Sequence, residues 1–261
     1  MAQIHCNFFS YSLGYGVDLT LLLPSMSPCD MGDEEKRTHK IPGKYPVLYL
    51  LHGHGNDYMS WNRFTSVERY AEERRIAVVT VSVGNKGYMN ADYGENYYDF
   101  IWKELPEFVK ANFPISHRKE DTYIAGASMG GYGALVHAFG HPESYQAVGA
   151  ISPGTDLGES ETACIGGHAL PKMKSLYKML KENVEKHIEL PNIFCCIGAQ
   201  DFLIDSVDKF HQYMECLQVE HYFDRVDGYE HEWAFWDIEI KKFLDWLPRT
   251  DIYAKMDRHK M

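Results

Sequence analysis

The sequence has no C-x-x-C pair among its six cysteines and no apolar run near the roughly 18 residues that span a membrane. Residues 1–23 lack a basic segment followed by an apolar one, so we expect strands there and not a secretory signal. Lys and Arg are scarce, 26 against 37 Asp and Glu, and the net charge of -11 repels polyanions. These absences predict a soluble, cytoplasmic protein with free thiols and with no nucleic-acid or membrane partner.

The overall composition is that of a globular protein. Charged residues make up 24% of the 261 positions and hydrophobic residues 45%. A chain of this length buries roughly three quarters of its unfolded surface, so its core needs no disulfide or metal. We find no internal repeat and expect one domain over residues 1–261; the oligomeric state stays open, and a homo-oligomer is compatible with the sequence.

Short apolar runs alternate with helical patterns along most of the chain. The runs are bounded by turn residues and lie at 47–51, 76–83, 122–127, 147–151, 193–197 and 222–226. This arrangement is typical of buried parallel strands joined by helices. Two stretches with alternating polarity, at 2–11 and 15–23, predict an antiparallel pair that opens the sheet. The fold class is therefore α/β, with a mostly parallel, doubly wound sheet, N-terminal antiparallel strands and helices on both faces.

Two segments interrupt the alternation. Residues 24–44 collect Pro, Ser, Asp, Gly and charges, and we interpret them as a solvated loop without a function of its own. Residues 152–190 contain a Gly-rich stretch and then an amphipathic helix. They are either a small cap over the site or an ordinary crossover helix with a long lead-in loop.

A Gly-x-Ser-x-Gly motif lies at residues 126–130, between a predicted strand and a predicted helix. A nucleophilic serine stands on a sharp strand-to-helix turn, where side chains two residues to either side would collide with the backbone. The amino terminus of the helix also favours a developing oxyanion. Ser128 is therefore the candidate nucleophile.

A serine hydroxyl needs a histidine to take its proton and an acid to orient that histidine. In folds of this kind the acid and then the histidine follow the serine along the chain. Asp201 follows the apolar run 193–197, and His231 follows the run 222–226. Because both lie just past strand ends, we expect them to converge with Ser128 at one edge of the sheet.

Asp205 and His221 are the alternatives for these two roles. Asp205 has the position of an N-cap for a helix that begins at residue 206, and His221 lies at a strand edge. Neither occupies the loop after a strand, where site residues belong. We therefore predict a triad of Ser128, Asp201 and His231.

The oxyanion of an acyl-transfer reaction needs preorganised N–H donors, each typically worth about 3 kcal/mol of barrier. One donor is expected from Met129, directly after the nucleophile. We assign the second to the N–H of His54 in the loop 51–55, where Gly53 allows the backbone to approach closely.

The same loop has a second interpretation. His52-x-His54 with Asp57 is similar to the H-x-H-x-D motif of metal-dependent hydrolases, in which imidazoles and a carboxylate hold zinc. The spacing is off by one residue, and Tyr58 stands where a further histidine is expected. We therefore predict no metal.

Aromatic residues surround the predicted site in the sequence. Trp61, Tyr88, Tyr93 and Trp233 lie near the strand ends and are candidates to contact substrate, together with Gly53. Trp102 and Tyr98 lie in a helical pattern, and for them we expect core packing.

Several of these motifs occur together in one known family. They are Leu50-Leu51-His52-Gly53 with Ser60-Trp61, the run 126–134 (GASMGGYGA), His141-Pro142-Glu143 with Ala147-Val148, Gly198-x-x-Asp201 and His231-x-Trp233-x-x-Trp236. The chain thereby resembles the esterase D-like α/β-hydrolases, which include tributyrin esterases, bacterial feruloyl and acetyl-xylan esterases and S-formylglutathione hydrolases. The resemblance implies an α/β-hydrolase fold and the triad already predicted, with no metal and no cofactor.

The sequence departs from the family pattern in the loop after residue 53. S-formylglutathione hydrolases usually have Leu-Thr-Cys there, and this chain has His54-Gly55, which argues against that branch. An apolar residue is expected at position 54, so the His54 side chain is a further candidate to contact substrate.

We therefore predict a serine carboxylesterase that acts through an acyl-enzyme on short-chain acyl or hydroxycinnamoyl (feruloyl) esters, with esters of plant-derived sugars as candidates. The net charge of -11 favours neutral substrates. The alternatives are an acetyl esterase on acetylated saccharides, an acyltransferase with the same triad, a metal-dependent hydrolase and a non-catalytic binding protein.

Overall fold

The two N-terminal stretches of alternating polarity form an antiparallel hairpin, β1 (Ala2–Ser10) and β2 (Tyr15–Leu23), at one edge of a sheet. The computed structural model describes residues 1–160, 164–165 and 167–261, and in it β2 pairs antiparallel with β4. The other strands of this sheet run parallel, in the order β1-β2-β4-β3-β5-β6-β9-β10. Their bounds are β3 Val47–Leu51, β4 Ala77–Val81, β5 Thr122–Ala127, β6 Ala147–Ile151, β9 Asn192–Gly198 and β10 Tyr222–Val226. The predicted α/β class with a doubly wound sheet is confirmed.

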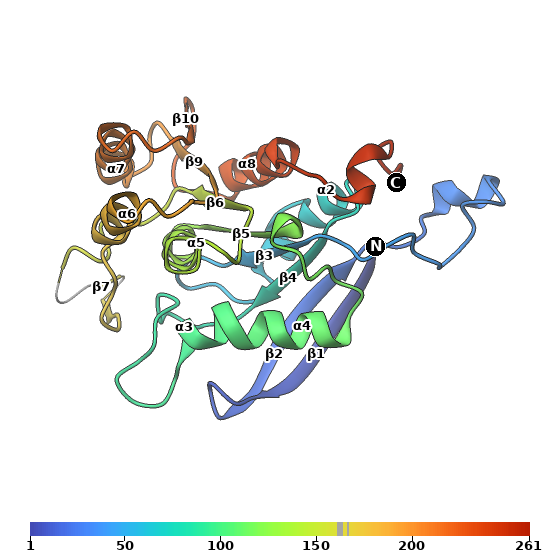
Figure 1. Ribbon diagram of the computed structural model, residues 1–261, viewed down its shortest axis with the longest axis horizontal. Helices are drawn as coiled ribbons and strands as arrows, with labels where there is room; N and C mark the ends of the chain where they lie inside the picture. The colour runs from blue at the N-terminus through green and yellow to red at the C-terminus, as the bar shows by residue number, and fades with distance from the viewer. Residues whose placement is uncertain (161–163, 166) are drawn as a thin grey trace.

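Helices cover both faces of the sheet (Figure 1). One face packs against α4 (Leu105–Asn112), α5 (Met129–Gly140), α6 (Leu176–Glu185) and α7 (Ile204–Cys216). The other face packs against α1 (Ser60–Phe64), α2 (Val67–Glu73) and α8 (Trp233–Trp246). The central strands β3 to β6 are buried along their whole length, which explains why they have continuous apolar runs and not alternating ones.

The helical stretch that contains Tyr98 and Trp102 is interrupted. It consists of α3 (Tyr97–Asp99), a π-helical turn η2 (Phe100–Glu104) and α4, in which Pro106 lies in the first turn. Proline has no backbone N–H, and the N–H groups in the first turn of a helix have no acceptor within the helix. Proline at that position therefore costs no hydrogen bond. The helix type therefore changes just before Pro106. Short 3-10 turns complete the described elements: η1 Pro28–Gly32, η3 Lys119–Asp121 and η4 Ile252–Lys255.

The 152–190 segment holds a two-residue pair, β7 (Cys164–Ile165) with β8 (His168–Ala169), and then α6. Residues 161–163 and 166 of this segment lie outside the described residues. Helix α6 packs beside α5, with Leu176 and Leu180 buried and the Asn183 amide donating to the Phe139 carbonyl at 2.8 Å. A cap over the site therefore stays a prediction.

The 24–44 segment protrudes from the body (Figure 1), but it is more than the solvated loop expected from its composition. Asp30 is buried and accepts a hydrogen bond from His259 Nε2 at 2.8 Å. The other ring nitrogen of His259 lies 2.7 Å from the Glu72 carboxylate. Because two carboxylates bind one imidazole, this cluster ties the segment to α2 and to the C-terminal residues.

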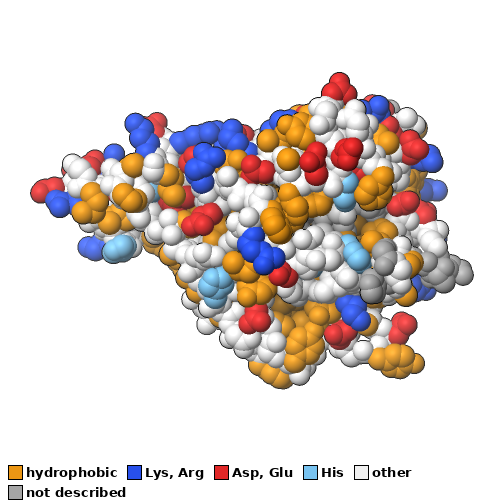
Figure 2. Space-filling view, turned by 180° about the vertical axis from the view of Figure 1, so that it is seen from behind, with side chains coloured by type: hydrophobic (Ala, Val, Ile, Leu, Met, Phe, Trp, Pro, Cys, Tyr) orange, Lys and Arg blue, Asp and Glu red, His pale blue; other side chains and the backbone are white. Residues whose placement is uncertain are grey.

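Charges of both signs are spread over the face shown in Figure 2, including the protruding segment, where Asp33, Glu34 and Glu35 precede Lys36 and Arg37. The excess of negative charge is thus not gathered into one patch on that face. Across the described ranges, no helix combines the length and the apolar character that crossing a membrane requires.

Candidate active site

Ser128 lies between β5 and α5 in a backbone conformation that side chains rarely adopt, with φ 58° and ψ -118°. Close packing explains the glycines beside it. A Cβ on Gly126 would lie 2.4 Å from the Gly130 carbonyl oxygen, and a Cβ on Gly130 would lie 2.4 Å from the Leu51 carbonyl oxygen. Only glycine fits at either position. The sequence thus forms a strained strand-to-helix turn at Ser128, the candidate nucleophile.

His231 and Asp201 are held together by a hydrogen bond. His231 Nδ1 lies 2.8 Å from Asp201 Oδ2, and because a carboxylate only accepts, Nδ1 carries the proton and donates it. The Nε2 atom of His231 is then left as the acceptor. Asp201 follows β9 and is fully buried, whereas the His231 side chain, in the loop between β10 and α8, is 16% exposed.

Asp201 is held as a carboxylate. Burial raises its pKa, but hydrogen bonds from His231, from the Leu203 N–H and from the Ser152 hydroxyl outweigh burial, so the pKa lies below the usual value. A negative charge on Asp201 favours the imidazolium that forms when His231 takes a proton.

Ser152 is part of this arrangement, and nothing in the sequence pointed to it. It directly follows β6, is fully buried and has φ 43°. It helps to lower the pKa of Asp201, and its hydroxyl accepts a hydrogen bond from the Trp236 indole at 3.4 Å. The Trp236 ring in turn packs edge-on against His231, with centroids 5.1 Å apart. Ser152 therefore influences Asp201 and is linked to His231 through the Trp236 ring.

These groups follow the carboxyl ends of four neighbouring strands. Ser128 comes after β5, Ser152 after β6, Asp201 after β9 and His231 after β10, and the strands lie side by side in that order. Backbone contacts tie the ends together, since the Ser128 N–H donates to Ile151 and the Ser152 N–H donates to Cys196. The carboxyl edge of a parallel sheet is where such folds place their sites.

The predicted oxyanion donors belong to two backbone segments next to the nucleophile. Met129 is the first residue of α5, so its N–H has no acceptor within the helix. The loop with Gly53 and His54 passes close by, because a Cβ on Gly53 would lie 3.5 Å from the Ser128 Cβ. This loop can therefore present a second N–H beside Ser128.

The candidate substrate contacts differ in their surroundings. Trp61 is buried and its indole donates to the Leu51 carbonyl at 2.9 Å; Tyr88 is buried and its hydroxyl donates to the His52 carbonyl at 2.7 Å. Both therefore support the loop after β3 from inside. Tyr93 is 92% exposed, and Trp233 is half-buried with its ring against Trp61 at 5.2 Å.

His52 is engaged within the protein. Its Nδ1 donates to the Gly53 carbonyl at 2.7 Å, and its Nε2 accepts from the Val83 N–H at 3.1 Å. Burial lowers the pKa of His52, in keeping with a neutral ring. This arrangement leaves neither ring nitrogen for a metal, and it does not favour the interpretation of the loop as a zinc motif.

The alternatives to Asp201 and His231 have other contacts. Helix α7 begins at Ile204, so Asp205 lies in its first turn and is not the N-cap expected from the sequence. The N-cap residue is Leu203, whose N–H donates to Asp201 Oδ1 at 2.9 Å. His221 lies 2.7 Å from His211 and 2.8 Å from the Val219 carbonyl.

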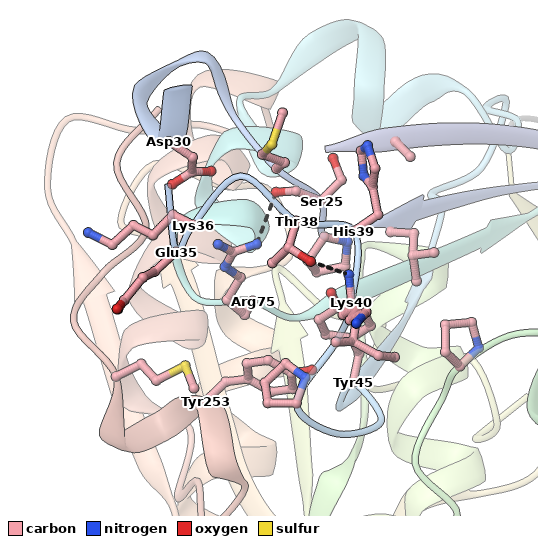
Figure 3. A pocket seen from close by; sticks show the side chains of 18 residues that line it. Ser25, Asp30, Glu35, Lys36, Thr38, His39, Lys40, Tyr45, Arg75 and Tyr253 are labelled. Atoms are coloured by element: carbon pink, nitrogen blue, oxygen red, sulfur yellow. Dashed lines mark hydrogen bonds between the residues drawn. The ribbon is translucent and has the colours of Figure 1, made fainter. Parts of the chain in front are cut away.

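A cavity of about 550 Å³ lies elsewhere, between the 24–44 segment, Arg75 and Tyr253 (Figure 3). Arg75 reaches the Ser25 carbonyl at 2.9 Å and so holds the segment against the body. None of the residues that line this cavity belongs to the group around Ser128.

The fold and the strained serine turn define an α/β-hydrolase of the esterase D-like kind. Residues 36–247 match the esterase family model, and the chain belongs to this family of carboxylic ester hydrolases. An acetyl esterase of Caldicellulosiruptor saccharolyticus is 24% identical over 271 residues, which cover 96% of this chain and 99% of the relative.

Two solved structures from Staphylococcus aureus are similar over almost the whole chain. FphF, a fluorophosphonate-binding serine hydrolase, has a TM-score of 0.81 and 30% identity, with coverage of 94% of this chain and 98% of its own. The S-formylglutathione hydrolase FrmB has a TM-score of 0.78 and 28% identity, with the same coverage of 94% and 98%.

Proposed function

We propose that this protein is a serine esterase that hydrolyses short-chain acyl esters, acetyl esters of saccharides first among them, through an acyl-enzyme. The observation that carries the proposal is the buried Asp201 bonded to His231 Nδ1, after strands β9 and β10 of the same sheet in which β5 precedes Ser128. This pair leaves His231 Nε2 free to act as the base that a serine nucleophile requires.

The residues support a two-step reaction. His231 Nε2 takes the proton of Ser128 while the oxygen attacks the ester carbonyl, and the N–H groups of Met129 and His54 bind the resulting oxyanion. The carbon–oxygen bond to the alcohol then breaks, and the departing alkoxide takes the proton from His231. Water, activated by the same imidazole, attacks the acyl-enzyme and releases the acid.

One comparison supports the acetyl substrate and another supports the serine chemistry. The relative from Caldicellulosiruptor is named an acetyl esterase, and FphF is named for binding fluorophosphonate, a reagent that reacts with activated serines. Glu230 and Glu232 are exposed on either side of His231, which favours neutral esters over anionic ones. Hydroxycinnamoyl esters remain the second substrate class that we propose.

The test compares p-nitrophenyl acetate, p-nitrophenyl butyrate, methyl ferulate and S-formylglutathione with wild type and Ser128→Ala. We expect turnover of the acetate and the butyrate, and a loss of at least about a thousandfold in kcat in the variant. The unfolding temperature of Ser128→Ala should match wild type. If the variant keeps most of the activity, Ser128 is not the nucleophile. Transfer of acetyl to an added sugar in preference to water would make the protein an acyltransferase.

A further inference from the structure

Phe202 directly follows the acid Asp201, and its side chain is 75% exposed. Its ring lies 4.6 Å from the His231 ring, centroid to centroid, at an interplanar angle of 52°. An exposed phenyl ring is unfavourable, because burying its apolar surface would stabilise the protein. An exposed apolar side chain in contact with the proposed base therefore calls for a functional explanation.

The reaction proposed above determines what lies beside that ring. His231 must return its proton to the departing oxygen, so this oxygen comes within about 3 Å of Nε2. The carbonyl oxygen points instead to the N–H groups of Met129 and His54. The alcohol part of the ester therefore leaves along the His231 side of the site, where Phe202 lies.

Phe202 is one end of a continuous series of aromatic rings. From His231 the series runs to Trp236 at 5.1 Å, then to Trp233 at 4.8 Å and to Phe64 at 5.2 Å between ring centroids. Trp236 is buried, whereas Phe64 is 49% exposed. The alcohol side of the site is thus bordered by flat apolar surfaces, with Glu230 and Glu232 exposed near them.

We propose that Phe202 is a specificity-determining residue that contacts the leaving group and selects uncharged alcohols with a flat apolar face, aryl or pyranosyl. Such a face buries area against the phenyl ring, which a linear alcohol does less well. Carboxylates nearby disfavour an anionic leaving group. This inference rests on the proposed function, because it uses His231 as the group that protonates the leaving oxygen.

The experiment measures two ratios of kcat/KM in wild type and Phe202→Ala. The alcohol ratio compares cyclohexyl acetate with ethyl acetate, and the acyl ratio compares ethyl butyrate with ethyl acetate. We expect the alcohol ratio to fall about three- to tenfold in the variant, the range that one aromatic contact supports, while the acyl ratio stays within about twofold. Phe202→Tyr should keep the wild-type alcohol ratio, and Phe202→Leu should lower it.

Phe9→Ala is the matched control, because Phe9 is 71% exposed on β1, at the far edge of the sheet from β10. Both ratios should be those of wild type in this variant. Phenyl acetate and a methyl 6-O-acetylpyranoside then distinguish the two kinds of ring: the one whose kcat/KM falls more in Phe202→Ala is the preferred leaving group.

An unchanged alcohol ratio in Phe202→Ala would overturn the inference. So would an equal loss on every ester with a shifted pH profile, since that result would make Phe202 a residue that only positions His231. Failure of the proposed function is a different outcome, in which wild type hydrolyses none of these esters.

Discussion

Replacing Ser152 by alanine tests whether the hydrogen bonds around Asp201 hold the site together. The variant removes a hydroxyl that helps to lower the pKa of this buried carboxylate, and it leaves the buried Trp236 indole without its acceptor. A buried donor left unsatisfied costs about 1–3 kcal/mol, so we expect unfolding at about pH 7 to need about 2 kcal/mol less. We also expect kcat/KM to fall about tenfold, which corresponds to about 1.4 kcal/mol of lost transition-state stabilisation.

The pH dependence identifies the cause of the loss. The pKa of Asp201 is lower in the folded protein than in the unfolded chain, so its contribution to stability is present above about pH 4 and is lost as the pH falls through the folded value. Ser152→Ala brings the folded-state pKa of Asp201 closer to its unfolded value and so weakens this contribution to stability. The difference in the free energy of unfolding between wild type and variant should be constant at neutral pH and should become smaller below about pH 4.

Urea unfolding over a pH series and ester hydrolysis measure these two effects. Ser206→Ala is the matched control, because the Ser206 hydroxyl donates to the neutral Leu203 carbonyl at 3.0 Å, and its loss should cost about 0.5–1 kcal/mol at every pH. A Ser152→Ala protein with wild-type stability and kcat/KM, or with a difference independent of pH, would refute this account of Ser152.

Three further substitutions test the packing at the serine turn and the cluster that holds the 24–44 segment. Gly130→Ala would place a Cβ 2.4 Å from the Leu51 carbonyl oxygen, so we expect a loss of about 3 kcal/mol or more and no activity, whereas Gly14→Ala, with open space around it, should cost about 1 kcal/mol and leave activity intact. Equal unfolding temperatures for these two variants would contradict the close packing at the serine turn. His259→Leu removes the imidazole that two buried carboxylates share and should cost about 3 kcal/mol, with proteolysis of the 24–44 segment but unchanged kcat. A variant as resistant to protease as wild type would show that this cluster does not fasten the segment.

Features that depend on nearby residues were predictable from the sequence. The strand, the turn and the helix around Ser128 lie within one short stretch of sequence. The glycines in it indicate where backbone segments pack closely. Asp201 and His231 could be placed because each follows an apolar run, and parallel strands bring their carboxyl ends to one edge.

Features that depend on distant residues were not predictable. Ser152 is a lone serine after a strand, and its indole partner lies 84 residues further along the chain. The 24–44 segment was expected to be a free loop because its composition is polar. Asp30 instead pairs with His259, which lies 229 residues further along the chain, and no pattern of neighbouring residues predicts such a contact.

The most direct test of the central claim is to find the acylated residue. Wild type is mixed rapidly with p-nitrophenyl acetate, quenched in acid and digested, and the peptide that carries the acetyl group is identified by mass spectrometry. The account predicts one acetyl group on Ser128, with a burst of p-nitrophenol that Ser128→Ala lacks. Hydrolysis with no acetylated peptide, or with the acetyl group on another residue, would contradict it.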